Sequence, residues 1–238
     1  MQKTLKIIKL SKSITMETDK KYKLTDECIT LGDKKLYRIE ALKDFASIKK
    51  GNKGGFVESE ENLSQNGNCW VYGNAKVCGN ATVCDNARVC GDAMVYGDAW
   101  VFGDAWVFGD AQVYGTANIY GNARVFENAK VYNDANIHGN AVVCGNAKVY
   151  GNAAVYSNAE IFSDATVISD SDYIIFKNWW SSGRCFTWTR SNNMWKVGCF
   201  YGTGEELIAK AYKDSELSGK EYERVVKYVE SILKDSEQ

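Results

Sequence analysis

The chain has 238 residues, enough for one large domain or two small ones, and its 29 Lys and Arg residues nearly balance its 30 Asp and Glu residues. This balance does not favour binding to nucleic acid or to a membrane surface. No apolar run approaches the roughly 18 residues of a membrane span. The basic residues 1–23 lack the apolar core and cleavage site of a signal peptide. We therefore expect a soluble, cytoplasmic protein.

Eight cysteines and one histidine bear on metal and disulfide chemistry. Cys78, Cys84 and Cys90 recur at steps of six residues, at a position that elsewhere holds Tyr or Phe, which indicates a packing role. No CxxC pair occurs and His138 is the only histidine. We therefore expect no zinc site and no cofactor.

Residues 1–60 precede any regular repeat. The segment CITLGDKKLYRI predicts a β-hairpin that turns at Gly32 and Asp33, and KKGNKGGFVE predicts a loop leading into the next region.

From Gly67 to Ile168 the chain consists of 17 six-residue units without an insertion. The fifth residue of each unit is Val or Ile, the third is Ala in every unit but the first, which has Cys69, and the second is Asn or Asp except at Thr116. The first is usually Gly. Such strict repetition predicts a solenoid in which every unit occupies an equivalent place.

The residue types at each position predict the shape of one unit. The third and fifth residues lie two apart, so on a strand both point to one face, the inside. Gly followed by Asn or Asp predicts a corner, because these residues tolerate positive φ. Each unit is therefore expected to be a short strand plus a corner. The hairpin before the repeat would then cover the open end of the solenoid.

The pattern Val-x-Gly-Asn-Ala-x resembles the hexapeptide repeat of left-handed parallel β-helix proteins. This resemblance implies that three units make one triangular coil, that residues 18 apart stack, and that the repeat forms nearly six coils, ~27 Å long. One departure is the residue after Val, which is often Gly in the acyltransferase branch of that family but Tyr, Phe or Cys here.

The segments RIEALKDF (38–45) and GGFVESEENLSQNGNCWVYGNAKV (54–77) also resemble the lead-in of hexapeptide-repeat proteins carried by bacterial prophages, whose function is largely unassigned. We therefore predict a mainly β fold. It comprises an N-terminal capping region at 1–60, a left-handed parallel β-helix (a hexapeptide solenoid) at 61–172, and a small C-terminal α+β domain at 173–238.

Stacking by 18 sorts the outward residues of the solenoid into three faces. One carries Trp70, Arg88, Trp106 and Arg124 beside Tyr72, Cys90, Phe108 and Phe126; a second carries Tyr96, Tyr114, Tyr132 and Tyr150 flanked by Lys76, Met94, Lys130 and Lys148; the third has Trp100, Phe102, Tyr120, His138 and Tyr156.

Two interpretations of these rings stay open. Stacked rings can simply stabilise one another, or the exposed apolar surface can mark an interface. Because Trp and Arg dominate binding hot spots, the candidate residues for a protein interface are Trp70, Arg88, Trp106, Phe108, Arg124, Phe126, Trp100 and Phe102. The Tyr and Lys face could also bind an anionic chain by stacking and charge.

After Ile168 the period fades. YIIFKNWW, RCFTWTR and MWKVGCF predict three strands. Two helices follow, opened by capping boxes at Thr203 with Glu206 and at Ser218 with Glu221. The second has an apolar stripe at Tyr222, Val225, Val226, Val229 and Leu233. Trp179, Trp180, Trp188 and Trp195 are expected to form the core of this domain, and Arg184 and Arg190 hint at an anion pocket.

Catalysis is not the expected function. His138, in NIHGNA, resembles a catalytic histidine of hexapeptide acyltransferases, but the uninterrupted repeat offers no loops to build a site around it. The carbonic anhydrases of the same β-helix group use three histidines to hold zinc, so a chain with one histidine is not expected to share that chemistry.

Three functions are considered. The first is a non-catalytic binding protein of phage or mobile-element origin. It would inhibit a host protein, such as a defence factor (as an anti-CRISPR protein does) or a nucleic-acid-processing factor. The second is a homo-oligomeric module, with a dimer favoured. The third is an acyltransferase.

Overall fold

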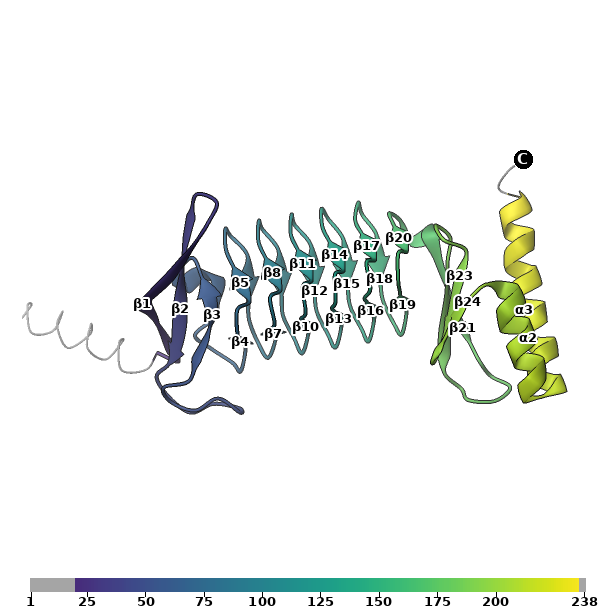
Figure 1. Ribbon diagram of the computed structural model, residues 1–238, viewed down its shortest axis with the longest axis horizontal. Helices are drawn as coiled ribbons and strands as arrows, with labels where there is room; N and C mark the ends of the chain where they lie inside the picture. The colour runs from purple at the N-terminus through teal and green to yellow at the C-terminus, as the bar shows by residue number, and fades with distance from the viewer. Residues whose placement is uncertain (1–19, 236–238) are drawn as a thin grey trace, which may run out of the picture.

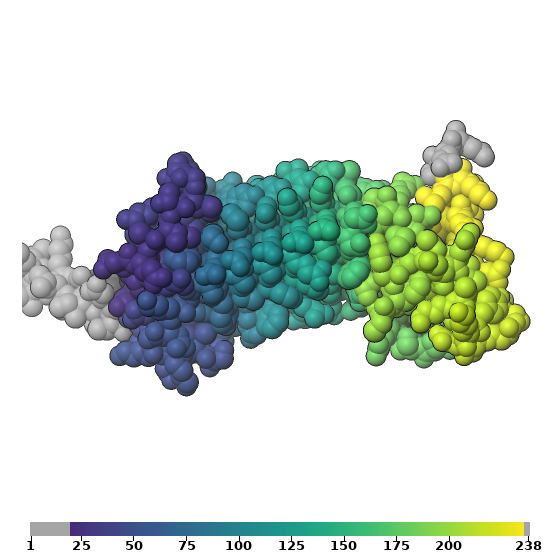
Figure 2. All heavy atoms as spheres, in the orientation of Figure 1, coloured from purple at the N-terminus to yellow at the C-terminus, as the bar shows by residue number. Residues whose placement is uncertain are grey.

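The computed structural model describes residues 20–235 and contains a parallel β-solenoid of about six turns. An N-terminal hairpin lies at one end of the solenoid, and a small antiparallel sheet with two helices lies at the other (Figure 1). The space-filling view shows the three parts in line, forming an elongated molecule (Figure 2). The predicted mainly β solenoid fold is therefore confirmed. The signal-peptide prediction falls mostly on residues 1–19, which lie outside the described residues.

The N-terminal part extends one sheet of the solenoid. Strands β1 (Tyr22–Leu31) and β2 (Lys34–Ala41) form an antiparallel hairpin, which turns at Gly32 and Asp33 as predicted. Strand β3 (Lys53–Val57) pairs antiparallel with β2 and parallel with β5, the second strand of the solenoid. A short turn of 3-10 helix, η1 (Glu60–Asn62), then leads to the first coil.

The solenoid has three faces, each a parallel sheet of two-residue strands 18 residues apart. We name each face by one of its central strands. The β10 face comprises β4 (Trp70–Val71), β7 (Arg88–Val89), β10 (Trp106–Val107), β13 (Arg124–Val125), β16 (Val142–Val143) and β19 (Glu160–Ile161). The β11 face comprises β5 (Lys76–Val77), β8 (Met94–Val95), β11 (Gln112–Val113), β14 (Lys130–Val131), β17 (Lys148–Val149) and β20 (Thr166–Val167). The β9 face comprises β6 (Thr82–Val83), β9 (Trp100–Val101), β12 (Asn118–Ile119), β15 (Asn136–Ile137) and β18 (Ala154–Val155).

The small aliphatic residues fill the interior as the period-two pattern predicts. The Ala at the third position and the Val or Ile at the fifth have no exposed surface in any unit, Ala105 and Val107 being typical. Burying each Val stabilises the fold by roughly 1.5–3 kcal/mol. One unit has too few such contacts to be stable alone, so the turns support one another.

The corners follow from the first two positions of each unit. The first residue has positive φ whether it is Gly103 (φ 67°) or Asp85 (φ 57°). The second donates its backbone N–H to the next turn, as Asp104 does to the Gly121 carbonyl at 2.8 Å. Asn side chains add a ladder that the sequence did not predict: Asn122 donates to Asn140 at 3.1 Å.

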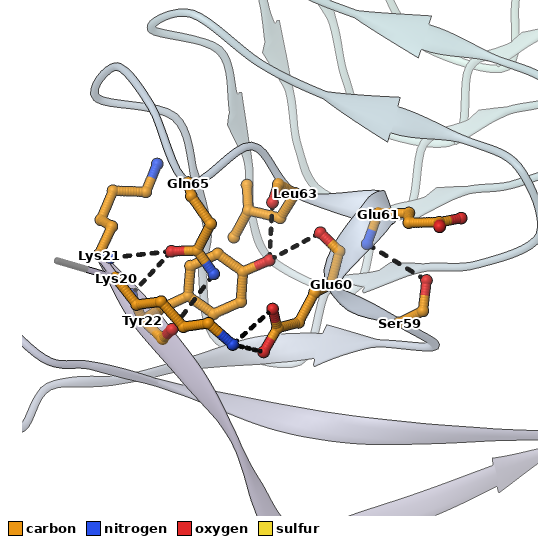
Figure 3. A network of polar contacts seen from close by, with 8 residues as sticks. All are labelled: Lys20, Lys21, Tyr22, Ser59, Glu60, Glu61, Leu63 and Gln65. Carbon is orange, nitrogen blue, oxygen red and sulfur yellow. Dashed lines mark hydrogen bonds and ion pairs between the residues drawn. The ribbon is translucent and has the colours of Figure 1, made fainter. Parts of the chain in front are cut away.

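A polar network closes the N-terminal end of the solenoid (Figure 3). The Tyr22 hydroxyl donates to the backbone carbonyls of Leu63 at 2.6 Å and Glu60 at 3.1 Å. The side-chain carbonyl of Gln65 accepts from the backbone N–H of Lys21 at 2.8 Å. Burial raises the pKa of Tyr22 well above its ordinary value. These contacts hold the start of β1 against the loop that enters the first coil.

The C-terminal part differs in detail from the prediction. Its antiparallel sheet has four strands rather than three: β21 (Tyr173–Lys177), β22 (Cys185–Thr189), β23 (Met194–Val197) and β24 (Phe200–Gly202), preceded by the 3-10 turn η2 (Asp170–Asp172). The segment MWKVGCF folds back on itself because Gly198 adopts a φ of 55° and makes a tight turn between β23 and β24.

Two helices, α2 (Gly204–Asp214) and α3 (Glu216–Asp235), pack on this sheet. The capping box of Thr203 with Glu206 is confirmed. The one predicted at Ser218 is wrong, since Ser218 lies inside α3 and donates its backbone N–H to the Ser215 hydroxyl at 3.1 Å. Neither helix is long and apolar enough to cross a bilayer.

The core of this domain lies between the sheet and the helices. Trp188 and Trp195 are buried there, as expected, together with Tyr222, Val226 and Val229 of the α3 stripe. Trp180 is half-buried and its ring meets those of Phe186 and Tyr222. The prediction was wrong for Trp179, which is 71% exposed because it lies in the loop after β21.

Candidate interaction surface

The fourth residue of each unit points outward, and the strand register sets which of these side chains are neighbours. Trp106 pairs with Arg88 on one side and with Arg124 on the other. Trp100 lies on the neighbouring β9 face, between Thr82 and Asn118. Because Trp100 and Trp106 belong to consecutive units, they lie on either side of one corner of the same turn.

Within the described solenoid, three large rings are exposed: Trp100, Trp106 and Tyr156. Trp100 is 50% exposed and Trp106 is 38% exposed. Each meets a half-buried Phe edge-on: Trp100 contacts Phe102 with centroids 6.4 Å apart, and Trp106 contacts Phe108 at 5.9 Å. An edge-on contact fixes the indole while leaving much of its surface open to solvent.

Trp70 does not belong to this surface, which corrects one of the predicted interface residues. It is only 1% exposed, because Tyr22 and Phe45 of the N-terminal part pack edge-on against its ring at centroid distances of 6.1 Å and 5.4 Å. Trp70 therefore anchors the N-terminal part to the first turn of the solenoid.

The residues at the sixth position form columns of stacked rings along the corners. Tyr96, Tyr114, Tyr132 and Tyr150 stack with successive centroids 4.7–4.9 Å apart. Phe108 and Phe126 stack at 4.7 Å, and Phe102 stacks on Tyr120 at 4.9 Å. Rings at this spacing are already in contact, so no base or sugar can insert between them. Within the Tyr column, the stacked rings therefore leave no open ring face on which an anionic chain could stack.

The β10 face carries two exposed arginines near its middle and, on β19, Glu160, which pairs with Lys196 at 3.4 Å. The Arg88 guanidinium lies over the Trp106 ring, 5.0 Å from its centroid. Among residues 20–235, neither Arg88 nor Arg124 forms an ion pair. The corners beside Trp106 carry Asp104 and Asp110, both exposed. The face therefore presents cations at its centre and carboxylates at its edges.

His138 occupies a place in one of the ring columns. It stacks between Tyr120 at 4.8 Å and Tyr156 at 5.5 Å, with small interplanar angles. Its imidazole therefore packs as the aromatic residues above and below it do. The acyltransferase alternative, in which this ring is a base, remains a prediction.

The two arginines that hinted at an anion pocket lie apart. Arg184 and Arg190 flank opposite ends of the five-residue strand β22, which places them roughly 20 Å from one another along the extended chain. Arg184 lines a cavity of about 210 Å³ with Asn178, Asp214 and Tyr222. The structure does not bring the pair together.

Comparison with known proteins supports the solenoid. The family described as the YdcK beta solenoid repeat matches residues 87–103, about one turn, which includes Arg88 and Trp100. This segment is similar to that repeat. No curated protein matches the chain.

Proposed function

We propose that this β-solenoid protein is a non-catalytic interaction protein, and that its solenoid presents a rigid aromatic surface to a protein partner in the cytoplasm. The observation that carries this proposal is the position of Trp100 and Trp106, two exposed rings on adjacent faces of one turn. With Arg88 and Arg124 they form the surface that we call the Trp ridge. Phe102, Phe108 and Phe126 support it from the corner columns.

Two properties of the Trp ridge favour binding: its exposed Trp and Arg side chains, and the rigid strands that carry them. Trp and Arg are the residues most enriched in binding hot spots, where each buries a large area. The ridge stands on strands whose backbone groups bond to the turns on both sides, as Trp106 N does to Ala123 O at 2.9 Å. A partner would therefore bind a surface that loses little conformational entropy on association.

More specifically, we propose that the chain is of phage or mobile-element origin and that it inhibits a host defence factor or a nucleic-acid-processing factor. This part rests on the sequence resemblance of residues 38–45 and 54–77. It predicts that expression of the chain protects an infecting phage in a host with an active defence system, and that protection is lost with the ridge.

Affinity capture with matched variants tests the proposal. The full chain, a Trp100→Ser/Trp106→Ser variant and a control Gln112→Ser/Asn136→Ser variant would each be used on lysate of the native source. We expect a protein that the wild type and the control retain and that the ridge variant loses. The same set of proteins from all three baits, with all three equally stable, would refute a role for the ridge.

A further inference from the structure

The corner column on one edge of the β10 face is nearly palindromic along the solenoid axis. The corner column that follows its strands reads Tyr72, Cys90, Phe108, Phe126, Cys144, Phe162. The midpoint of this column falls between Phe108 and Phe126, and each residue has a counterpart of similar kind at the same distance on the other side. The flank of the face therefore has a similar profile in both directions.

The outward residues of the strands are complementary about the same midpoint. Along the face they read Trp70, Arg88, Trp106, Arg124, Val142, Glu160. Reversal about the midpoint brings Trp106 opposite Arg124, a ring opposite a cation. It also brings the long Arg88 opposite the short Val142.

Among residues 20–235, Arg124 is the charged side chain of this face that no ion pair or ring contact occupies. Arg88 already covers the Trp106 ring at 5.0 Å. In the described part of the chain, the Arg124 guanidinium is exposed and takes part in no hydrogen bond or ion pair. A guanidinium carries five N–H donors and can also stack on an aromatic ring. A second Trp106 ring would supply such a partner.

The corner residues are complementary in the same way. On the turn of Trp106 the two corners carry the carboxylates Asp104 and Asp110, whereas on the turn of Arg124 they carry the amides Asn122 and Asn128. All four side chains are exposed. Reversal about the midpoint therefore places Asp104 opposite the Asn122 amide and near the Arg124 cation. At the other corner Asp110 lies opposite Asn128, whose neighbour Glu127 is an exposed carboxylate.

We propose that the β10 face is a homodimer interface. A twofold axis runs parallel to the strands between β10 and β13, so that the two solenoids lie antiparallel. Trp106 of each copy packs against Arg124 of the other, and Asp104 of each lies beside Asn122 and Arg124 of the other. Such an isologous contact closes on itself and does not continue into a filament. The inference rests on the proposed function, since it names one partner of the Trp ridge, and it leaves Trp100 on the β9 face free.

The size of the face sets the expected strength. Because the N-terminal part covers Trp70 on β4, five free strands at ~4.8 Å and a breadth of about five residues give a face of roughly 24 Å by 17 Å. This is well below the ~800 Å² per partner of a standard stable interface. The dimer is therefore expected to dissociate in the micromolar range.

Sedimentation equilibrium of the full chain across micromolar concentrations tests the inference. We expect a monomer–dimer equilibrium that Arg124→Asp weakens roughly tenfold or more. Asp104→Arg should also weaken it, and the double variant Asp104→Arg/Arg124→Asp should restore it, because both copies then carry the exchanged charges. Lys130→Asp, which makes the same charge change on the β11 face of the same turn, should have no effect. Circular dichroism and urea unfolding confirm that each variant is folded.

Three results would overturn the dimer: a monomer at every concentration, a dimer indifferent to Arg124→Asp, or a loss that the double variant does not restore. A monomeric chain whose ridge still retains a captured protein would overturn this inference and leave the proposed function standing. A dimer that retains no other protein would support the dimer interface and would contradict binding of a different protein by the ridge.

Discussion

The Nζ atom of Lys21 lies 3.2 Å from the Sγ atom of Cys69, the one residue at the third position of the repeat that is not Ala. Lys21 is only 1% exposed. Its ammonium also donates to the backbone carbonyls of Cys69 at 3.0 Å and of Asn66 and Gly67 at 3.4 Å. A cation thus occupies the end of the apolar interior, held by carbonyls rather than by a carboxylate.

The first prediction concerns the pH dependence that this buried cation imposes. Burial lowers the pKa of Lys21 below its ordinary value. Between the folded pKa and the unfolded value of about 10.4, the unfolded chain binds more protons than the folded one, so stability rises with pH there. Lys21→Met removes this contribution.

Urea unfolding of both proteins from neutral pH to about pH 10.5 measures the effect. The stability of the wild type relative to Lys21→Met should be constant at lower pH and should rise as the pH approaches the unfolded pKa of Lys. The tyrosines titrate in both proteins and cancel in the difference. A difference that falls with pH would contradict the assignment.

The repeat was predictable because the six-residue period fixes which positions of each unit point into the solenoid and which point out. In one such unit, Ala105 and Val107 point inward and Trp106 points outward, and the equivalent positions of the other units follow the same pattern. The burial of Trp70 was not predictable. The rings that cover it, Tyr22 and Phe45, lie outside the repeat, and no spacing in the sequence relates them to the first unit. The interface residues of the middle turns could be placed on faces, but the difference between Trp70 and Trp106 needed tertiary contacts.

The second prediction compares these two tryptophans of one column. Trp70→Ala should lower the free energy of unfolding by about 3–5 kcal/mol, because it leaves a cavity between the N-terminal part and the first turn. Trp106→Ala should cost about 1 kcal/mol or less, because its ring is partly in solvent. Urea unfolding monitored by far-UV circular dichroism measures both. Equal losses would mean that Trp106 is structural rather than available for binding.

The third prediction separates backbone strain from crowding at the corners. Gly121 and Gly183 have nearly the same φ, 68° and 67°. A Cβ atom at Gly121 would lie 3.0 Å from the backbone N of Gly139 in the next turn, whereas a Cβ at Gly183 would meet nothing within 4 Å. Gly183→Ala should therefore cost only the strain of positive φ, about 1–2 kcal/mol.

Gly121→Ala should lower the free energy of unfolding by the same strain cost and by about 1–3 kcal/mol more, because the added Cβ atom forces two turns apart. The difference between the two variants in urea unfolding isolates the spacing of the coils. If the two losses agree, the turns are not in close contact at this corner.

The fourth prediction concerns His138, whose ring lies between Tyr120 and Tyr156. His138→Ala breaks two stacking contacts and should destabilise the solenoid by about 1–3 kcal/mol. His138→Phe keeps a flat ring in the column, as Phe126 does in another, and should change stability by less than about 1 kcal/mol. Thermal and urea unfolding of the two variants measure these effects. Because Phe cannot accept a proton, an acyl-transfer activity that the wild type has and His138→Phe lacks, at equal stability, would show that this ring has a catalytic role beyond packing.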